Sequence, residues 1–137
     1  MTKETLIQAK ERIQPYIHRT PVLMSQLLNE KADCNLFFKC ENFQKMGAFK
    51  MRGAANAILS LSMEERRRGV VTHSSGNFAQ AVALAAQKLG VKAYIVMPEN
   101  APQVKKDGVK TYHGEIIECA STPQAREATA KKVQEEK

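Results

Sequence analysis

The sequence predicts an α/β protein built on a parallel sheet of βαβ units. From about residue 70 onward, short apolar runs typical of buried strands alternate with longer helical patterns. Such alternation is typical of parallel strands joined by helical crossovers. The chain has 137 residues, enough to bury a core of its own. Hydrophobic residues make up 43% and charged residues 26%, which indicates a globular protein rather than a disordered chain or a coiled coil.

The first 40 residues predict helices, an extended stretch and one strand. Apolar residues recur at helical spacing near the N-terminus until a proline interrupts them. A residue before proline avoids the helical region, so an extended exit follows. The predicted elements are a helix over Thr2–Ile17 stopped by Pro15, an extended stretch at Thr20–Pro21, a helix over Ser25–Lys31 capped by Ser25, and a strand over Leu36–Cys40.

The rest of the chain predicts a regular succession of helices and strands. A helix with one apolar face comes first, and a strand, a polar turn and an alanine-rich helix come next. Two further pairs of strand and helix complete the pattern. The predicted elements are a helix from near Phe49, a strand at Val70–His73, a helix closed by Gly90, a strand at Ala93–Pro98, a helix at Ala101–Val109, a strand at Glu115–Cys119 and a helix over Pro123–Lys137.

Charge, hydropathy and cysteine content exclude several classes of function. The net charge of +7 is spread along the chain, and its dense run Arg66–Arg68 lies beside glutamates without aromatic residues, which favours a solvated helix end over a nucleic-acid site. No apolar run is long enough for a membrane helix, and no secretory signal is recognisable, so we expect a cytoplasmic protein without membrane partners. Cys34, Cys40 and Cys119 lack metal-ligand spacing and are expected to be reduced packing residues.

Two polar turns, Lys45–Gly53 and Thr72–Asn77, precede predicted helices and are candidate binding sites. Free backbone N–H groups and the positive end of the helix dipole suit a carboxylate or phosphate there. Capped turns without any ligand have the same composition, and this alternative stays open. Lys50 lies between Phe49 and Met51 at a helix start, where desolvation would favour a neutral, nucleophilic amine. An exposed lysine without a special role is the other interpretation.

The two turns and the segments around them carry a resemblance to a known family. The stretch KCENFQKMGAFKMRGAANAI, followed by VVTHSSGNFAQAVALAAQKLGVKAYIVMPENAP, resembles the serine racemase and serine/threonine dehydratase family of pyridoxal-phosphate enzymes, fold type II. The match spans nearly the whole chain. A lysine motif and an SSGN turn in this order, with YIVMP and EIIEC strands behind them, are more specific than either turn alone.

The resemblance implies a role for six residues. Lys50 corresponds to the family lysine that forms a Schiff base with pyridoxal phosphate and then takes the Cα proton of the substrate. Elimination of the β-hydroxyl of serine or threonine then gives a 2-oxo acid and ammonia. The other implied roles are contact with the cofactor by Asn77 and Phe49, a second acid or base for racemisation at Ser75, and binding of the substrate carboxylate by Ser74, Ser75, Asn77 and Arg126.

The chain also departs from the family pattern. Phe78 stands where most relatives carry a histidine, which puts the choice of substrate in doubt, and Met46 and Ala48 replace small hydroxyl residues. Family members are more than twice as long. Their glycine-rich loop for the cofactor phosphate and their ligands for a divalent cation have no counterpart here, so no metal site is expected in this chain.

The expected organisation is that of a truncated product. Residues 1–67 correspond to the first part of the large cofactor domain and residues 68–137 to most of the small domain. The resemblance implies a homo-oligomeric parent enzyme, a lyase or racemase acting on an amino acid, and possible use of a divalent cation by that parent. The alternative is a non-catalytic product that folds around the small domain.

Overall fold

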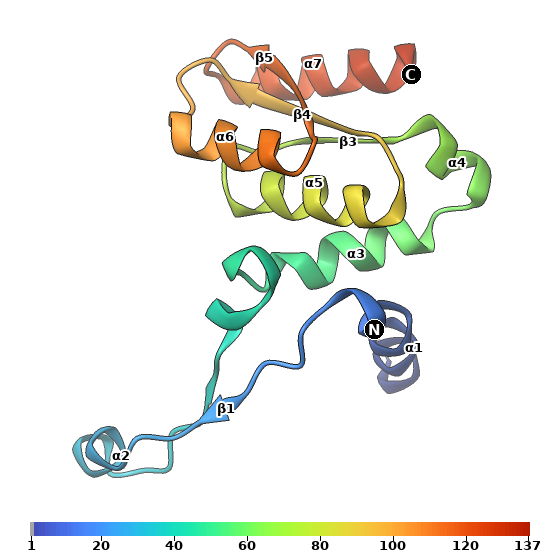
Figure 1. Cartoon of the computed structure of the whole chain (residues 1–137). Coiled ribbons are helices and arrows are strands. Elements are labelled where there is room, and N and C mark those ends of the chain that lie inside the picture. The colour runs from blue at the N-terminus through green and yellow to red at the C-terminus, as the bar shows by residue number, and fades with distance from the viewer. Residues whose placement is uncertain (1) are drawn as a thin grey trace.

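The computed structural model describes residues 2–137, which form a small α/β body with an extended arm (Figure 1). The arm and the helix beside it come from the N-terminal part of the chain, and the sheet comes from the C-terminal part. The elements before the sheet are α1 (Lys3–Ile13), a 3-10 turn η1 (Gln14–Tyr16), β1 (Val22–Leu23), α2 (Gln26–Ala32), β2 (Phe38–Lys39), the 3-10 turns η2 (Glu41–Phe43) and η3 (Lys45–Gly47), α3 (Lys50–Ser60) and α4 (Met63–Arg68).

The body is built on a three-stranded parallel sheet, which confirms the predicted fold class. The strand order is β3-β4-β5, with Val71 opposite Tyr94 and Ile95 opposite Ile116. Helices α5 and α6 cover one face of the sheet and α7 covers the other (Figure 1). The elements are β3 (Val70–His73), α5 (Asn77–Leu89), β4 (Ala93–Pro98), α6 (Gln103–Thr111), β5 (Glu115–Cys119) and α7 (Pro123–Glu136).

The core lies where α5 is enclosed by α3, α6 and the sheet. Residues Ala81–Ala86 of α5 are all buried, and a helix that is apolar on every side must be covered on every side. Small alanines let α3 approach closely, so Met51 and Ile58 of α3 pack into the same core. Gly90 ends α5 in the left-handed conformation that favours glycine. In the sheet, every residue of the central strand β4 is buried.

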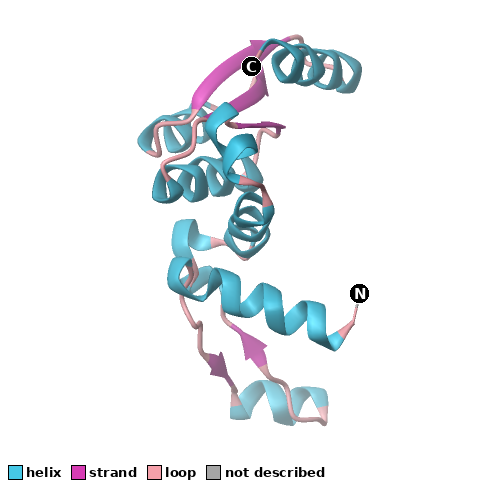
Figure 2. Cartoon of the chain, turned by 90° about the vertical axis from the view of Figure 1, so that its right-hand side faces the viewer, coloured by secondary structure: helices cyan, strands magenta, loops and turns pink. Residues whose placement is uncertain are grey.

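Residues 21–40 form the arm, which extends away from the body and is closed at its base by a hydrogen bond from the Cys40 amide to Pro21 O at 3.0 Å (Figures 1 and 2). Strands β1 and β2 pair antiparallel over two residues each, with Val22 opposite Lys39 and Leu23 opposite Phe38. The predicted strand over Leu36–Cys40 is therefore wrong in extent, because β2 has one neighbour and no sheet beyond it. Helix α2 does form behind its predicted cap, where the Ser25 hydroxyl accepts a hydrogen bond from the Leu28 amide.

Most other predicted elements are confirmed. The predicted solvated helix end at Arg66–Arg68 is the last turn of α4; the start of this helix was not predicted, and Ser62 and Glu65 build a capping box there. The cysteines are all free, as expected, but Cys34 is exposed in the arm, so the packing role predicted for it is wrong. No helix in residues 2–137 is long and apolar enough to span a membrane. The division of the chain into residues 1–67 and 68–137 stays a prediction.

Candidate active site

Lys50 is the first residue of α3, and its side chain is exposed. Its ammonium Nζ lies 5.0 Å from the centre of the Phe49 ring and 5.9 Å from the centre of the Phe78 ring. Aromatic faces attract a cation at such distances. None of the salt bridges within residues 2–137 involves Lys50. The amine is therefore accessible to a reagent from solution. Of the two interpretations of this lysine, its exposure agrees with that of an exposed side chain.

The segment Ser74–Asn77, here called the SSGN turn, connects β3 to α5. The Ser74 amide donates to Val96 O at 3.1 Å and so continues the β3–β4 ladder, while the Gly76 amide reaches Ser74 Oγ at 3.4 Å. Gly76 is the N-cap of α5 and provides no side-chain cap. A Cβ placed at Gly76 would meet no atom within 4 Å. The turn therefore faces open space with the first amides of α5.

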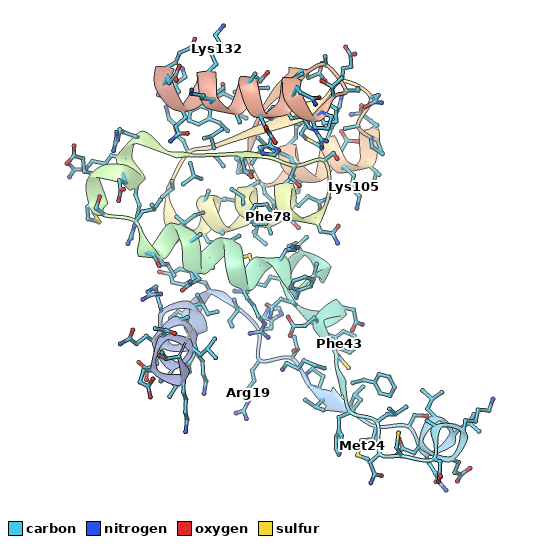
Figure 3. The ribbon with its side chains drawn as sticks, turned by 180° about the vertical axis from the view of Figure 1, so that it is seen from behind. Arg19, Met24, Phe43, Phe78, Lys105 and Lys132 are labelled. Atoms are coloured by element: carbon cyan, nitrogen blue, oxygen red, sulfur yellow. The ribbon has the colours of Figure 1, made fainter. Side chains whose placement is uncertain are left out.

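Asn77 links the SSGN turn to α6. Its Oδ1 accepts a hydrogen bond from Lys105 Nζ at 3.2 Å. Figure 3 labels Lys105 on α6 and Phe78 on α5, the two helices that follow the carboxyl ends of β4 and β3. Sequence reasoning missed Lys105. The available signal was its place shortly after a parallel strand, because the carboxyl ends of such strands share one edge of the sheet.

The structure brings the two predicted turns together. Lys50 and Phe78 are far apart in the sequence, but the packing of α3 against α5 places the beginnings of both helices side by side. Phe49 and Phe78 lie beside the Lys50 amine, and the SSGN turn directly precedes Phe78; its two serines are half-buried and Asn77 is exposed. The carboxyl edge of the sheet therefore has a primary amine, two hydroxyls, an amide side chain and a helix N-terminus.

Arg126 is not in contact with this group of residues. It lies in the first turn of α7, on the other face of the sheet, where its backbone N–H donates to Thr122 O at 3.2 Å. Within residues 2–137 no side-chain hydrogen bond or ion pair joins its guanidinium to Lys50 or to the SSGN turn. Because α7 follows the carboxyl end of β5, Arg126 lies at the same edge of the sheet, but its predicted contact with a substrate stays a prediction.

Charged groups next to Lys50 have shifted pKa values. Hydrogen bonds from Arg52 lower the pKa of Glu41 from 4.5 to about 2, and the same bonds raise the pKa of Arg52. Burial lowers the pKa of Lys45, and the charge of Lys88 adds to this effect. The pKa values of the two basic residues Lys45 and Arg52 are therefore shifted in opposite directions. Within residues 2–137 no three His, Cys, Asp or Glu side chains gather as a metal site would require.

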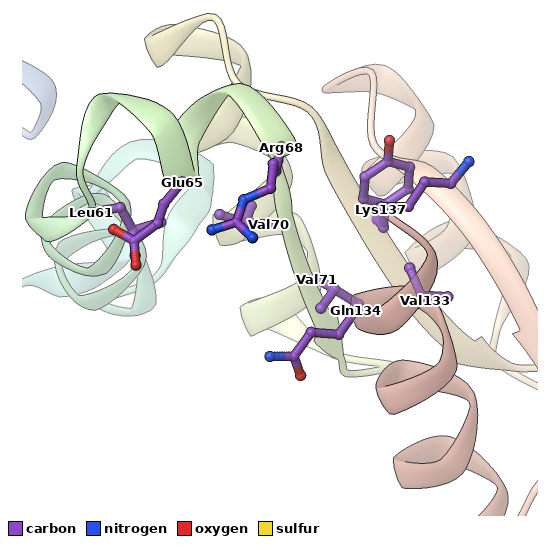
Figure 4. A pocket seen from close by; sticks show the side chains of 10 residues that line it. Leu61, Glu65, Arg68, Val70, Val71, Val133, Gln134 and Lys137 are labelled. Atoms are coloured by element: carbon purple, nitrogen blue, oxygen red, sulfur yellow. The ribbon is translucent and has the colours of Figure 1, made fainter.

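Two hollows flank strand β3, and the larger lies away from the site. A cavity of about 390 Å³ is open to solvent between the start of β3 and the last turn of α7, with Val70, Tyr94 and Lys137 in its wall (Figure 4). It opens at the amino end of the strands, whereas the SSGN turn lies at their carboxyl end. A smaller hollow of about 210 Å³ lies between α3 and β3 and includes Phe78 and Thr72.

The residues at the carboxyl edge fit one part of pyridoxal phosphate. The Lys50 amine is free to meet an aldehyde, the Phe49 ring is 58% exposed beside it, and the Asn77 amide lies at the same edge. The glycines with positive φ are Gly47, Gly69 and Gly90, which occupy three separate turns and do not make a backbone cradle for a phosphate. The chain thus provides groups for the aldehyde and the ring of the cofactor.

Comparison with known proteins supports the same cofactor. The family model described as "Pyridoxal-phosphate dependent enzyme" matches residues 13–137. Serine racemase of Oryza sativa subsp. indica is 56% identical over 129 residues, which are 94% of this chain and 38% of that protein. Beta-hydroxyaspartate dehydratase of Paracoccus denitrificans is 50% identical over 135 residues, 98% of this chain and 43% of the relative.

A solved structure agrees in three dimensions. The crystal structure of serine racemase from Dictyostelium discoideum superposes with a TM-score of 0.95 at 48% identity, covering 99% of this chain and 44% of that one. The chain spans about two fifths of the length of these relatives and corresponds to their N-terminal portion. Both the matched residues and the shared fold therefore show that this chain belongs to the pyridoxal-phosphate dependent enzymes.

Proposed function

We propose that the chain is the N-terminal part of a pyridoxal-phosphate-dependent ammonia-lyase that converts serine or threonine to a 2-oxo acid and ammonia. The observation that carries the proposal is the position of the Lys50 amine, 5.9 Å from the ring of Phe78, the residue directly after the SSGN turn. A reactive amine and a group of carboxylate-binding donors then act on the same small molecule. The similarity to a protein named a dehydratase supports elimination as the reaction.

Lys50 has two tasks in this proposal. Its amine holds the cofactor, and when a substrate amine displaces it, Nζ takes the Cα proton. When bound, pyridoxal phosphate provides the electron sink that stabilises the negative charge left on Cα. The exposed position of Lys50 at the start of α3 supports both tasks, because Nζ must reach a ligand that arrives from solvent.

The SSGN turn binds and orients the substrate carboxylate in this proposal. The hydroxyls of Ser74 and Ser75 and the first amides of α5 donate hydrogen bonds, and the positive end of the α5 dipole favours an anion. Asn77 contacts the cofactor ring, with Phe49 beside it. Arg126 approaches the carboxylate when the small domain closes.

Racemisation is the second candidate activity. Ser75 is half-buried in the turn that faces Lys50 and carries a hydroxyl able to return a proton to Cα. The relatives from Oryza sativa and Dictyostelium discoideum are named serine racemases. If Ser75 returns the proton on the face opposite Lys50, the amino acid leaves with inverted configuration, and elimination competes with this outcome.

Further properties concern the longer protein and its surroundings. A homo-oligomer and use of a divalent cation by the longer protein remain predictions from the resemblance. A cytoplasmic location and the absence of a nucleic-acid partner remain predictions from the sequence composition. The alternative to catalysis is a product that folds around residues 68–137 and retains the cofactor weakly. Within residues 2–137 the three turns with positive-φ glycines support this alternative, since they make no phosphate cradle.

Reductive trapping tests the role of Lys50. The amine condenses with the cofactor aldehyde with loss of water, and borohydride reduces the resulting C=N bond to a stable secondary amine. Peptide mapping by mass spectrometry then reads the yield at each lysine. We expect labelling at Lys50 to exceed that at Lys88, an exposed lysine in the last turn of α5, by about tenfold or more.

Variants show whether the cofactor reacts specifically with Lys50 or with any exposed lysine. Lys50→Ala should abolish the excess label, while Lys88→Ala should leave the Lys50 label unchanged. Equal labelling of Lys50 and Lys88 in the unaltered chain would contradict the proposed role of Lys50. Labelling of the SSGN turn variant Asn77→Ala should fall, since the ring of the cofactor then loses a hydrogen-bonding partner.

A further inference from the structure

Lys50 begins α3 without the usual support of a helix start. Phe49 occupies the N-cap position and makes no side-chain hydrogen bond to the helix. In the turn before it, Met46 has φ 55° and Gly47 has φ 74°, both in the left-handed region. Because no capping side chain fixes the position of Lys50, other contacts must keep its amine beside the SSGN turn.

The Glu41 carboxylate and the Arg52 guanidinium form an ion pair across the segment that contains Lys50. Arg52 Nε donates to Glu41 Oε2 at 2.9 Å, and Arg52 Nη2 donates to Glu41 Oε1 at 2.7 Å. A two-pronged contact of this kind fixes both the distance and the orientation of the two groups. Glu41 is the first residue of η2 and Arg52 lies in the first turn of α3, so the pair clamps residues 41–52 with Lys50 inside.

Glu41 is also anchored to the preceding extended stretch. The hydroxyl of the buried Thr20 donates to Glu41 Oε1 at 2.6 Å. Buried Gln44 continues the connection: it accepts from the His18 amide at 2.8 Å and donates to His18 O at 2.9 Å. Arg52 Nη2 reaches the same His18 carbonyl at 3.4 Å. The clamp therefore holds α3 against residues 18–20, a part of the chain remote in sequence.

We propose that Glu41 is a positioning residue for Lys50, which it holds in place through Arg52. This inference rests on the proposed cofactor-binding role of Lys50. Arg52 and Lys50 lie two residues apart in one helical turn, so fixing the guanidinium fixes the backbone from which the Lys50 side chain starts. Because α5 packs along α3, the start of α3 cannot shift without changing the distance from Lys50 Nζ to the SSGN turn.

The test uses reductive trapping with pyridoxal phosphate on the whole 137-residue chain and its variants. Glu41→Gln removes the charge of the side chain and keeps its shape. Arg52→Lys keeps the positive charge and removes the second hydrogen bond to Glu41. Glu118→Gln is the matched control, because it breaks a second ion pair, the 2.6 Å contact of Glu118 on β5 with Lys106. The rate of labelling at Lys50 is measured across a range of pH.

Glu41→Gln should lower the labelling rate at Lys50 by about tenfold at every pH, with Arg52→Lys intermediate and Glu118→Gln within about twofold of the unaltered chain. Lys106 serves as the internal reporter of unfolding, since its side chain is 11% exposed. Its labelling should stay low in Glu41→Gln if the variant remains folded.

Three results would overturn the positioning role. One is an unchanged Lys50 rate in a folded Glu41→Gln chain. Another is a loss at Lys50 accompanied by a rise at Lys106, which indicates unfolding. The third is a change in the pH at which the labelling rate of Lys50 is half-maximal, with the same maximal rate. This result indicates that Glu41 acts on the charge of Lys50 instead. If labelling of the unaltered chain does not favour Lys50 over Lys88, the proposed cofactor role of Lys50 fails. This outcome is distinct from the three above, which concern the positioning role of Glu41.

Discussion

The amine of Lys50 lies 5.9 Å from the centre of the Phe78 ring, and the two residues belong to different helices. Phe78 is half-buried between α3 and β3 and lines the small hollow together with Ala54 and Ile58. The ring thus has two roles: it joins α3 to α5, and it forms one wall beside the amine. Packing and the candidate site depend on the same side chain.

Replacing this ring should weaken the fold. We expect Phe78→Ala to lower the free energy of unfolding by about 1–3 kcal/mol, because the ring loses its contacts with the α3 face and leaves a cavity. Urea denaturation followed by circular dichroism measures the change. Phe37→Ala is the matched control; Phe37 is 67% exposed in the arm, and its loss should cost less than about 0.5 kcal/mol. Equal effects at both positions would show that Phe78 does not join the two helices.

Much of the body was predictable from local patterns, because its elements are closed by strong sequence signals. The end of α5 at Gly90 and the start of α2 behind Ser25 follow from glycine and serine capping. Strand β4 was predictable because a run of apolar residues has only a buried interior to occupy.

The contacts between distant segments were not predictable in this way. Lys105 reaches Asn77 only because two helices begin at one edge of the sheet, and spacing along the chain does not encode that distance. The Glu41–Arg52 pair depends on two irregular 3-10 turns with a left-handed residue at Met46, for which the sequence offers no periodic signal. The resemblance to a family supplied the candidate site residues, whose roles stay predictions, and the fold added the contacts between distant segments.

The Glu41–Arg52 pair should make the stability of the chain depend on acid. The pKa of Glu41 is about 2 in the folded chain against an ordinary value of 4.5, mainly because Arg52 donates to its carboxylate. A lowered folded-state pKa gives stability that is full above pH 4.5 and is lost as the pH falls toward 2. We expect Glu41→Gln to be less stable than the unaltered chain by about 1–2 kcal/mol near neutral pH, since solvent screens this partly exposed pair.

Urea denaturation at a series of pH values measures this dependence. The difference between Glu41→Gln and the unaltered chain should narrow below pH 4.5 and nearly vanish near 2. Glu118→Gln should show a smaller difference at neutral pH, because the Glu118 side chain is 57% exposed. A Glu41→Gln difference that does not change with pH would show that the carboxylate charge adds nothing to stability.

Two glycines should respond in opposite ways to alanine. Gly69 has φ 101°, and a Cβ there would lie 3.0 Å from Lys92 O and 3.1 Å from the Tyr94 ring. Gly69→Ala should therefore lose about 1–3 kcal/mol of stability. Gly53 lies inside α3 with open space around its Cα, so Gly53→Ala should gain about 0.5–1 kcal/mol. Thermal denaturation of both variants checks the pair, and a gain at Gly69 would contradict the strained turn between α4 and β3.

The arm should make the chain associate with itself. Strands β1 and β2 and helix α2 expose an apolar surface with no cover from the body, and surfaces of this kind favour association. The exposed residues are Val22, Leu23, Met24, Leu27, Leu28, Phe37 and Phe38. Sedimentation velocity should show oligomers at high concentration, and the double variant Leu27→Ser with Phe37→Ser should shift them toward monomer. Val104→Ser, on the exposed side of α6, is the control that should change nothing, and a monomer at every concentration would contradict the expectation.

The phosphate of the cofactor should contribute little to its capture by this chain. Within residues 2–137 the candidate groups would contact the aldehyde and the ring of the cofactor, and the positive-φ glycines occupy three separate turns instead of one cradle. Reductive trapping with pyridoxal and with pyridoxal phosphate, each normalised to the label on Lys88, should therefore give Lys50 rates within about threefold of each other. Gel filtration before reduction should remove most of the cofactor in both cases, because a condensation that releases water is reversible. A preference of a hundredfold or more for pyridoxal phosphate, together with a yellow chain after gel filtration, would instead mean that residues 2–137 hold the phosphate themselves. The first amides of α5 at the SSGN turn would then be the site to test, with Gly76→Ala as the variant that narrows the open space beside them.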